Sequence, residues 1–303
     1  MAISRSQLVK ELEPGLNALF GLEYKRYENQ HAEIYTNENS DRAFEEEVML
    51  SGFGNASVKA EGQGVAFDDA QETFTARYTH ETVALAFAIT EEAIEDNLYD
   101  RLASRYTKAL ARSMSNAKQV KAVELLINGL PGVGTFTSGD GVSLFNKDHP
   151  TIAGVFANTL QTQADLNETS LEQSLIDIGK MTDERGLKVA ARGVKMIVPQ
   201  ELQFTAERLM KSQGRTGTAD NDINAIASMG MIPQGYRVNN YLTDTDAFYI
   251  ITDVPNGMKM FTRAPLTTAM EGDFDTGNVR YKARERYSFG VSDPRGIFAS
   301  PGA

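Results

Sequence analysis

The chain has 303 residues, of which 41% are hydrophobic and 23% charged, so it can fold around a packed core and is not a disordered polypeptide. Acidic residues outnumber basic ones by 41 to 30, and the net charge of −11 disfavours a nucleic-acid reader, which needs a basic surface. The absence of cysteine excludes disulfides, thiolate metal sites and cysteine nucleophiles, and fits a reducing compartment. The three histidines, His31, His80 and His149, are far apart in the sequence.

Neither a membrane span nor a secretion signal is visible in the sequence. The longest apolar runs, such as residues 83–89, are much shorter than a bilayer requires. The first seven residues lack the apolar stretch of a signal peptide. We therefore expect the protein to stay in the compartment where it is made.

Residues 1–45 have the pattern of an N-terminal arm. Pro14 and Gly15 interrupt an initial helical pattern, and the remainder as far as Arg42 is polar and rich in turn-forming residues. Such a segment has little to pack against in its own chain. We expect it to become ordered by lying on another molecule.

The next segment, from Glu45 to Ile89, has the pattern of β-strands interrupted by glycines. A long run from Thr73 to Ile89 alternates apolar with small or polar residues. The pattern predicts a long two-stranded hairpin with an apolar base and an amphiphilic outer part. A limb of about 12 residues reaches ~40 Å, and a two-stranded ribbon is marginal in water, so the outer part should rest on another molecule.

The strongest helical pattern runs from Glu91 to Asn128, without glycine or proline, and stops at Gly129 and Pro131. Thr90 is suited to cap its first turn. This helix would be ~57 Å long, or ~46 Å with a break near residues 96–97. A compact chain of this length has a diameter of about 50 Å, so we expect an elongated or flat molecule.

The second half of the chain alternates short strands and helices after a loop-rich stretch at 129–166 and a helix at about 168–185. We predict a separate α/β lobe at 187–260. Its expected elements are strands near 194–198, 236–242, 247–253 and 257–262, helices at 199–210 and 223–229, and an exposed polar loop at 212–222. A final long strand should run from 278 to about 291, followed by a turn at 292–296.

Catalytic and ligand-binding patterns are weak. Gly132-Val133-Gly134 is not followed by the residues of a phosphate loop, and residues 273–277 are too short for a calcium loop, so both are read as turns. The consecutive acids Glu45, Glu46 and Glu47 point to different sides, which favours an ion-paired or solvated face over paired catalytic carboxylates. His149 lacks neighbouring ligand types. We expect no catalytic residue, cofactor or metal site.

One charged pattern is more specific, because four cations alternate along the last predicted strand and so share one face. They are Arg280, Lys282, Arg284 and Arg286. Three interpretations stay open: contact with nucleic-acid backbone, contact with carboxylates of an adjacent subunit, or a freely solvated face. Between the two partners, the net charge of −11 favours carboxylates.

The order of these elements resembles the major capsid protein of tailed bacteriophages, which has the Hong Kong 97-type shell fold, over essentially the whole chain. Three stretches are similar to relatives of the Mu-like head subunit. They are Phe44-Glu45-Glu46, Leu144-Phe145 followed by Asp148-His149-Pro150, and the stretch 278–296, which begins Asn278-Val279-Arg280-Tyr281 and ends at Gly296.

The resemblance implies an α+β fold with an N-arm (1–45), an E-loop hairpin (46–84), a P-domain (85–186 and 261–303, spine helix about 91–128) and an A-domain (187–260), whose loop 212–222 would lie near the five- and six-fold axes. It implies a structural protein, not an enzyme, that self-assembles into hexamers and pentamers of an icosahedral head. Double-stranded DNA would be packaged without sequence specificity. A portal and a separate scaffold protein are the expected partners, with decoration proteins as a further option. Location in the virion and assembly in the host cytoplasm follow.

The resemblance also suggests that charged residues of the hairpin and of the closing strand form the subunit interface. These candidates are Glu45, Glu46, Glu47, Lys59, Arg77, Arg280, Lys282, Arg284, Arg286 and Arg295. Some relatives crosslink an E-loop lysine to an asparagine of the next subunit with a glutamate as base. Lys59, Asn278 and Glu285 are the matching residue types, although a merely ion-paired Lys59 is favoured.

Two other functions stay open at this point. An encapsulin-like cellular nanocompartment would use the same fold to hold cargo enzymes instead of a genome. A soluble enzyme that uses carboxylates of the 187–260 lobe would be compact and would have a deep polar pocket.

Overall fold

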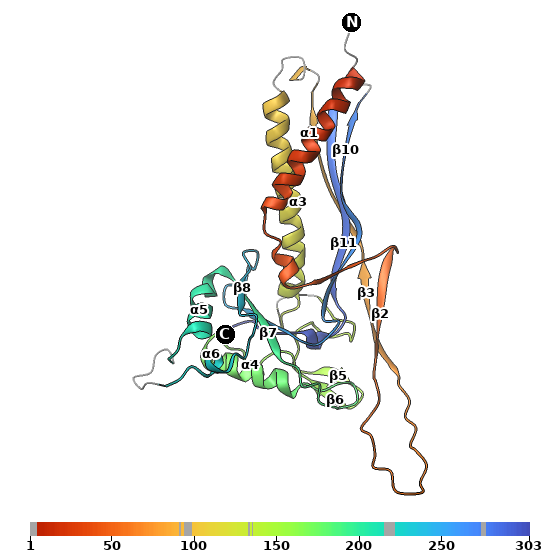
Figure 1. The fold of residues 1–303 in the computed structure, drawn as a ribbon, viewed down its shortest axis with the longest axis vertical. Coiled ribbons are helices and arrows are strands. Elements are labelled where there is room, and N and C mark those ends of the chain that lie inside the picture. The colour runs from red at the N-terminus through yellow and green to blue at the C-terminus, as the bar shows by residue number, and fades with distance from the viewer. Residues whose placement is uncertain are drawn as a thin grey trace.

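The computed structural model describes residues 5–90, 92–93, 99–132, 134, 136–214, 222–273 and 277–303. Figure 1 shows an elongated molecule with a long helix and long strands at one end, a lobe at the other, and a projecting hairpin. The predicted helix start at Glu91 and the break near 96–97 lie outside the described residues, as do most of the 212–222 loop and the centre of the 273–277 turn. None of the helices in the described part of the chain is long and apolar enough to cross a membrane.

A four-stranded sheet and two helices build the elongated end. The strand order is β1-β10-β11-β4, and the strands are β1 (Thr36–Asn39), β10 (Met258–Gly272), β11 (Val279–Val291) and β4 (Glu81–Ile89). β1 is parallel to β10, whereas β10, β11 and β4 are antiparallel to their neighbours. Helices α1 (Arg5–Arg26) and α3 (Tyr99–Asn128) pack on one face of this sheet. α3 ends at Asn128, as the sequence predicts.

The N-terminal segment differs from the expectation of an arm without contacts in its own chain. Pro14 lies inside α1, which continues through it. Leu16 and Phe20, four residues apart, are buried against α3 and β11, and Asn17 accepts hydrogen bonds from Thr268 and Tyr281. Burial of this apolar stripe compensates for the backbone hydrogen bond that a proline removes.

After α1, the short 3-10 helix η1 (Gln30–Glu33) also contacts the rest of the chain, because Glu33 forms an ion pair with Lys195 at 2.6 Å. The expectation that residues 1–45 need another molecule to pack against is therefore wrong for these elements.

The predicted hairpin is present, but its second limb is shorter than expected. β2 (Phe44–Leu50) pairs antiparallel with β3 (Glu72–Thr79), and residues 51–71 form an extended loop without strands. The run from Thr73 to Ile89 is divided at His80, after which β4 pairs with β11 in the main sheet. The alternation of side chains continues through this change of partner, because β3 and β4 each turn one face toward the rest of the chain, and the break is therefore not visible in the sequence.

A second four-stranded sheet forms the lobe, in the order β12-β9-β7-β8. Its strands are β7 (Gly193–Val198), β8 (Tyr236–Val238), β9 (Phe248–Thr252) and β12 (Ile297–Ser300). The helical elements of the lobe are α4 (Glu168–Lys180), η2 (Gln200–Leu202), α5 (Gln203–Lys211) and α6 (Ala225–Met229). The side chain of Asn167 accepts a hydrogen bond from Ser170 N–H in a capping box at the start of α4.

The lobe is larger than the predicted range of 187–260. Leu171, Leu175 and Ile178 of α4 pack in the same apolar cluster as β7 and β9, and Phe298 of β12 completes it. The sequence missed β12 because its four residues are all buried and show no alternation. A short hairpin, β5 (His149–Thr151) and β6 (Gly154–Phe156), and the turn η3 (Pro294–Gly296) lie beside this sheet.

Candidate subunit interface

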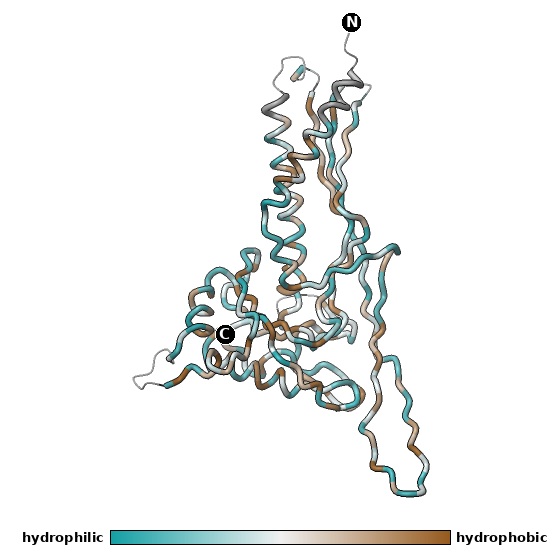
Figure 2. Tube along the Cα trace, viewed as in Figure 1, coloured by the Kyte–Doolittle hydropathy of each residue, from teal (hydrophilic) through white to brown (hydrophobic). Residues whose placement is uncertain are grey.

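The outer part of the β2–β3 hairpin exposes apolar side chains. Among the described residues, a side chain of the loop 51–71 is attached to the lobe at Asp68, which contacts Arg185. Val58 and Phe67 are 100% and 98% exposed, and Phe53 and Val65 are also exposed. Figure 2 shows hydrophobic stretches, in brown, alternating with hydrophilic ones, in teal, along the projecting loop. Large apolar side chains in water are characteristic of a surface that is covered in an assembly.

The root of the hairpin is fixed to the main sheet by buried polar contacts. Lys259 of β10 forms ion pairs with Glu47 of β2 and, at 3.1 Å, with Glu38 of β1. Burial alone would lower the pKa of Lys259, but the hydrogen bonds to these two carboxylates raise the pKa above its usual value. Ser292 donates a hydrogen bond to Glu47 and also contacts the hydroxyl of Tyr78.

Of the other predicted acids of β2, Glu46 is exposed and Glu45 is half-buried. Glu46 pairs with Arg77 across the hairpin at 3.7 Å, and the Arg77 guanidinium lies 4.0 Å from the centre of the Phe44 ring. Glu45 accepts a hydrogen bond from Ser40 at 2.7 Å. Glu45 and Glu47 are thus half-buried on one face of β2, whereas Glu46 is exposed on the other face.

β11 presents its cations on one face, as its alternation predicts. Arg280, Lys282 and Arg284 are exposed and Arg286 is half-buried, on the side of the sheet opposite to α1 and α3. The residues beside them on β4 are Ala88, Ala86, Ala84 and Thr82. Because the side chains of these neighbours are small, they do not cover the cations, which remain accessible to a partner.

The other face of β11 holds a buried ion pair that the sequence could not specify. Glu285 points toward α3, and its carboxylate lies 3.1 Å from the Nζ of Lys118. Burial raises the pKa of Glu285, although Lys118 opposes this shift. Glu285 is thus enclosed beneath the helix, whereas Lys59 is exposed in the hairpin loop. Glu285, which the resemblance suggests as the base of a crosslinking reaction, is therefore not accessible to Lys59 of a neighbouring subunit.

Arg295 is a correction to the predicted interface. It is only 2% exposed, and it donates hydrogen bonds to Glu184 at 2.6 Å, to Thr182 O at 2.8 Å and to Asp293 at 3.3 Å. Its guanidinium lies 4.4 Å from the centre of the Phe156 ring. A guanidinium that is buried together with its ion-pair partners belongs to the interior, so Arg295 is not part of the candidate subunit interface.

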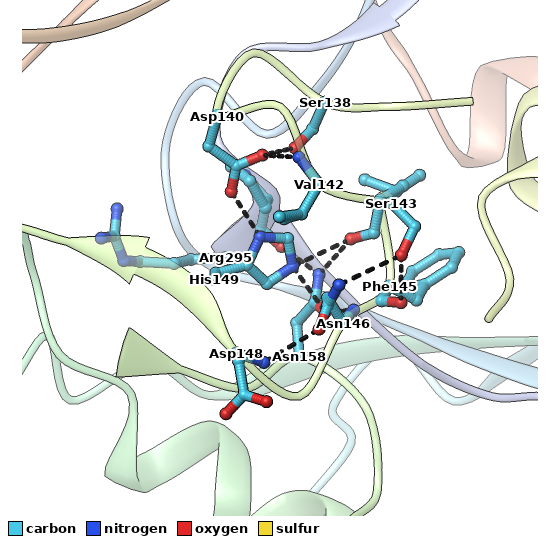
Figure 3. Close-up of polar contacts among 12 residues, drawn as sticks. Ser138, Asp140, Val142, Ser143, Phe145, Asn146, Asp148, His149, Asn158 and Arg295 are labelled. Atoms are coloured by element: carbon cyan, nitrogen blue, oxygen red, sulfur yellow. Dashed lines mark hydrogen bonds and ion pairs between the residues drawn. The ribbon is translucent and has the colours of Figure 1, made fainter. Parts of the chain in front are cut away.

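Next to Arg295, His149 is the centre of a buried hydrogen-bond network (Figure 3). Its Nδ1 lies 2.6 Å from Asp140 Oδ2, and its Nε2 lies 3.0 Å from Asn158 Oδ1 and 3.2 Å from Leu144 O. The Nδ2 of Asn158 donates to Leu144 O and Pro294 O, which leaves Oδ1 to face the imidazole. Both ring nitrogens thus face oxygen atoms, and Nδ1 is in direct contact with the carboxylate of Asp140.

This network connects loops and does not have the geometry of a catalytic site. Ser138 donates its hydrogen bond to the carboxylate of Asp140 and not to the imidazole, so there is no nucleophile beside a base. Among the described residues, no group of three or more His, Asp or Glu side chains could hold a metal ion. His149 contacts Asp140 and Asn158, and Asn158 in turn contacts Pro294 of η3. The sequence does not show that these residues meet.

The comparisons with known proteins identify the class of protein. Residues 72–300 match the family model described as phage capsid protein, which covers most of the chain. The chain belongs to the phage capsid protein family and is a structural shell protein. No curated protein sequence matches the chain significantly.

Solved structures show the same fold at low sequence identity. The virus-like particle from Pyrococcus furiosus is 10% identical, with a TM-score of 0.54, and the match covers 95% of this chain and 98% of that chain. The capsid of Myoviridae phage XM1 is 12% identical, with a TM-score of 0.54, and the match covers 89% of each chain. The structure described as Mycobacterium phage Adephagia is 12% identical, with a TM-score of 0.53 and 91% of each chain covered. The predicted α+β fold of the Hong Kong 97 type is confirmed, whereas the similarity to Mu-like head subunits stays a prediction.

Proposed function

We propose that this chain is the major head subunit of a tailed bacteriophage, and that it forms hexamers and pentamers of an icosahedral shell around double-stranded DNA. DNA would be enclosed without sequence-specific contacts, as suits an acidic wall with a net charge of −11. A portal and a separate scaffold protein would take part in assembly in the host cytoplasm. The subunit would act as a wall and not as a catalyst.

The observation that carries this proposal is the projecting hairpin. Its loop exposes Phe53, Val58, Val65 and Phe67, and a two-stranded ribbon of this kind is not stable by itself in water. A second copy of the chain would cover these side chains. In this arrangement the hairpin is the E-loop, residues 1–45 are the N-arm, and the long helix α3 and the main sheet form the P-domain. The α/β lobe is the A-domain, extended by α4 and β12.

We further propose that the cationic face of β11 contacts carboxylates of an adjacent subunit. Residues 44–79 contain seven acids and two bases, so the hairpin is an anionic surface of the opposite sign. Arg280 already has Asp273 as a partner, which leaves Lys282 and Arg284 as the main candidates for contacts between subunits.

Negative-stain electron microscopy of the purified protein, combined with nuclease treatment and nucleic-acid extraction, tests the proposal. We expect closed shells in the expressed protein, and nuclease-protected double-stranded DNA in particles made with the portal and packaging proteins. Shells that hold a co-expressed protein cargo, and that never package DNA, would instead indicate a nanocompartment. A monomer at all concentrations would contradict the shell proposal itself.

A further inference from the structure

A single side chain, Asp68, links both limbs of the hairpin loop to the lobe. Its Oδ2 accepts a hydrogen bond from Gly54 N–H at 2.7 Å, across the loop. Its Oδ1 lies 2.6 Å from an Nη of Arg185, which follows α4 in the lobe, and the same Nη donates to Asp69 O at 3.3 Å. The hydrogen bond from Gly54 and the contacts with Arg185 hold the pKa of Asp68 below its usual value, although burial opposes this shift.

The lobe side of this contact is rigid. Arg185 lies in a turn in which Asp183 accepts hydrogen bonds from the N–H groups of Arg185 at 2.9 Å and Leu187 at 2.7 Å. The preceding residue, Glu184, points inward and holds the buried Arg295. In this turn, Glu184 therefore binds a buried arginine of the lobe, and the next residue, Arg185, binds the hairpin loop.

The hairpin side of the contact is comparatively free. Residues 51–71 contain no strand, and the loop beyond Gly54 and Asp68 carries exposed apolar side chains, among them Val58. The hairpin thus has two kinds of attachment, a buried one at Lys259 and an exposed one at Asp68. Exposed ion pairs contribute little to stability and weaken with salt, so the outer attachment can open while the root stays closed.

We propose that the Asp68–Arg185 ion pair is a reversible latch, which holds the hairpin beside its own lobe in the free subunit and opens when a neighbouring subunit takes the hairpin loop. This inference rests on the proposed function, because the neighbour that replaces the latch is a second copy of this chain. The latch explains why the apolar loop 51–71 is attached to the lobe in a subunit that has not yet assembled.

The test compares cleavage of the hairpin by a low concentration of chymotrypsin, which cuts after Phe53 and Phe67, in the dilute unassembled subunit. The latch variants are Arg185→Gln and Asp68→Asn, and the matched controls are Lys188→Gln in the neighbouring lobe segment and Glu61→Gln in the loop, both at exposed positions. We expect cleavage of Arg185→Gln to be about two- to five-fold faster than that of the wild type, and the controls to be unchanged.

Two further measurements make the result specific. Added salt should raise the cleavage rate of the wild type toward that of Arg185→Gln and leave the variant nearly unchanged. The double variant Asp68→Asn/Arg185→Gln should be cleaved no faster than the faster single variant, because both substitutions break one interaction. Equal cleavage of wild type and Arg185→Gln, or additive effects in the double variant, would overturn the latch.

Assembled particles distinguish the latch from the shell proposal. If shells form and the latch opens in them, wild type and Arg185→Gln should be cleaved at the same rate within the shell. Faster cleavage of the variant in shells would show that the ion pair persists there and would overturn its release. If the wild type forms no shells, the proposed function fails, while the cleavage difference in the free subunit is still measured independently.

Discussion

Nδ1 of His149 lies 2.6 Å from Oδ2 of Asp140, and both side chains are buried. The pair joins the loop that follows α3 to the β5–β6 hairpin, and Asn158 extends the contacts to the chain near η3. A buried carboxylate is stable in the interior only when its oxygens are hydrogen-bonded or paired, so Asp140 depends on the groups that face it. The loops around residues 138–158 are therefore held by a polar interaction and not by apolar packing alone.

Asp140→Asn should destabilise the unassembled subunit and change how its stability depends on pH. Burial alone raises the pKa of Asp140, but hydrogen bonds from His149 and Ser138 outweigh this effect and lower the pKa below its ordinary value of 3.8. The stabilisation is present above 3.8 and is lost as the pH falls through the lowered value. We expect a loss of about 2 kcal/mol in unfolding free energy at pH 7, the usual contribution of hydrogen bonds to a charged group.

Urea unfolding at several pH values between neutrality and the acid range measures this effect. The difference between wild type and Asp140→Asn should shrink as the pH falls, and the exposed Asp148→Asn serves as the control. A difference that stays constant across the acid range would show that ionisation of Asp140 is not responsible.

Glu47→Gln should loosen the root of the hairpin, because it removes the charge that faces Lys259. The pKa of Lys259 is raised above 10.5, so its contribution is complete at neutral pH and is lost only as the pH rises through that raised value. A hydrogen bond to a charged group contributes about 2 kcal/mol, and we expect a loss of this size locally.

Hydrogen–deuterium exchange of the amides in β2 and β3 is the measurement for Glu47→Gln. Exchange should become faster in these strands, while Glu46→Gln, which breaks only an exposed pair with Arg77, should behave as the wild type. Equal protection in the two variants would mean that the buried ion pair does not hold the hairpin.

Lys59 should not form a covalent crosslink in assembled particles. The residue that could act as base, Glu285, is buried beneath α3 and paired with Lys118 at 3.1 Å. A denaturing gel of purified shells should show only monomer bands, for the wild type and for Lys59→Arg alike. A ladder of crosslinked species that disappears in Lys59→Arg would contradict this expectation.

The sequence predicts where long helices and strands lie better than it predicts where a strand changes its pairing partner. The alternation at 279–287 indicated both β11 and its cationic face, and the stop at Gly129 indicated the end of α3. The division of the strand run at His80 was not visible, because a buried face continues across it.

The charged residues of the interior were the hardest to predict. Arg295 has Asp293 and Glu184 as partners, and the second is 111 residues away, so nothing local separates it from a surface arginine. Pro14 likewise reads as a helix break, but α1 continues through it, and Leu16 and Phe20 pack in the same apolar cluster as residues of α3 and β11. Such outcomes depend on tertiary contacts, which a single sequence does not display.

Reversal of two cations on β11 tests the proposed contact between subunits. In Lys282→Glu/Arg284→Glu, the exposed face of the sheet would repel the anionic hairpin of a neighbour, since like charges at an interface are unfavourable. We expect at least about a ten-fold lower shell yield, which corresponds to about 1.4 kcal/mol, and shells that dissociate at lower salt.

Quantitative negative-stain microscopy and sedimentation measure both. The exposed Lys188→Glu and an unchanged melting temperature of the free subunit control for general charge effects. Unchanged yield and salt resistance would leave these cations as a solvated face.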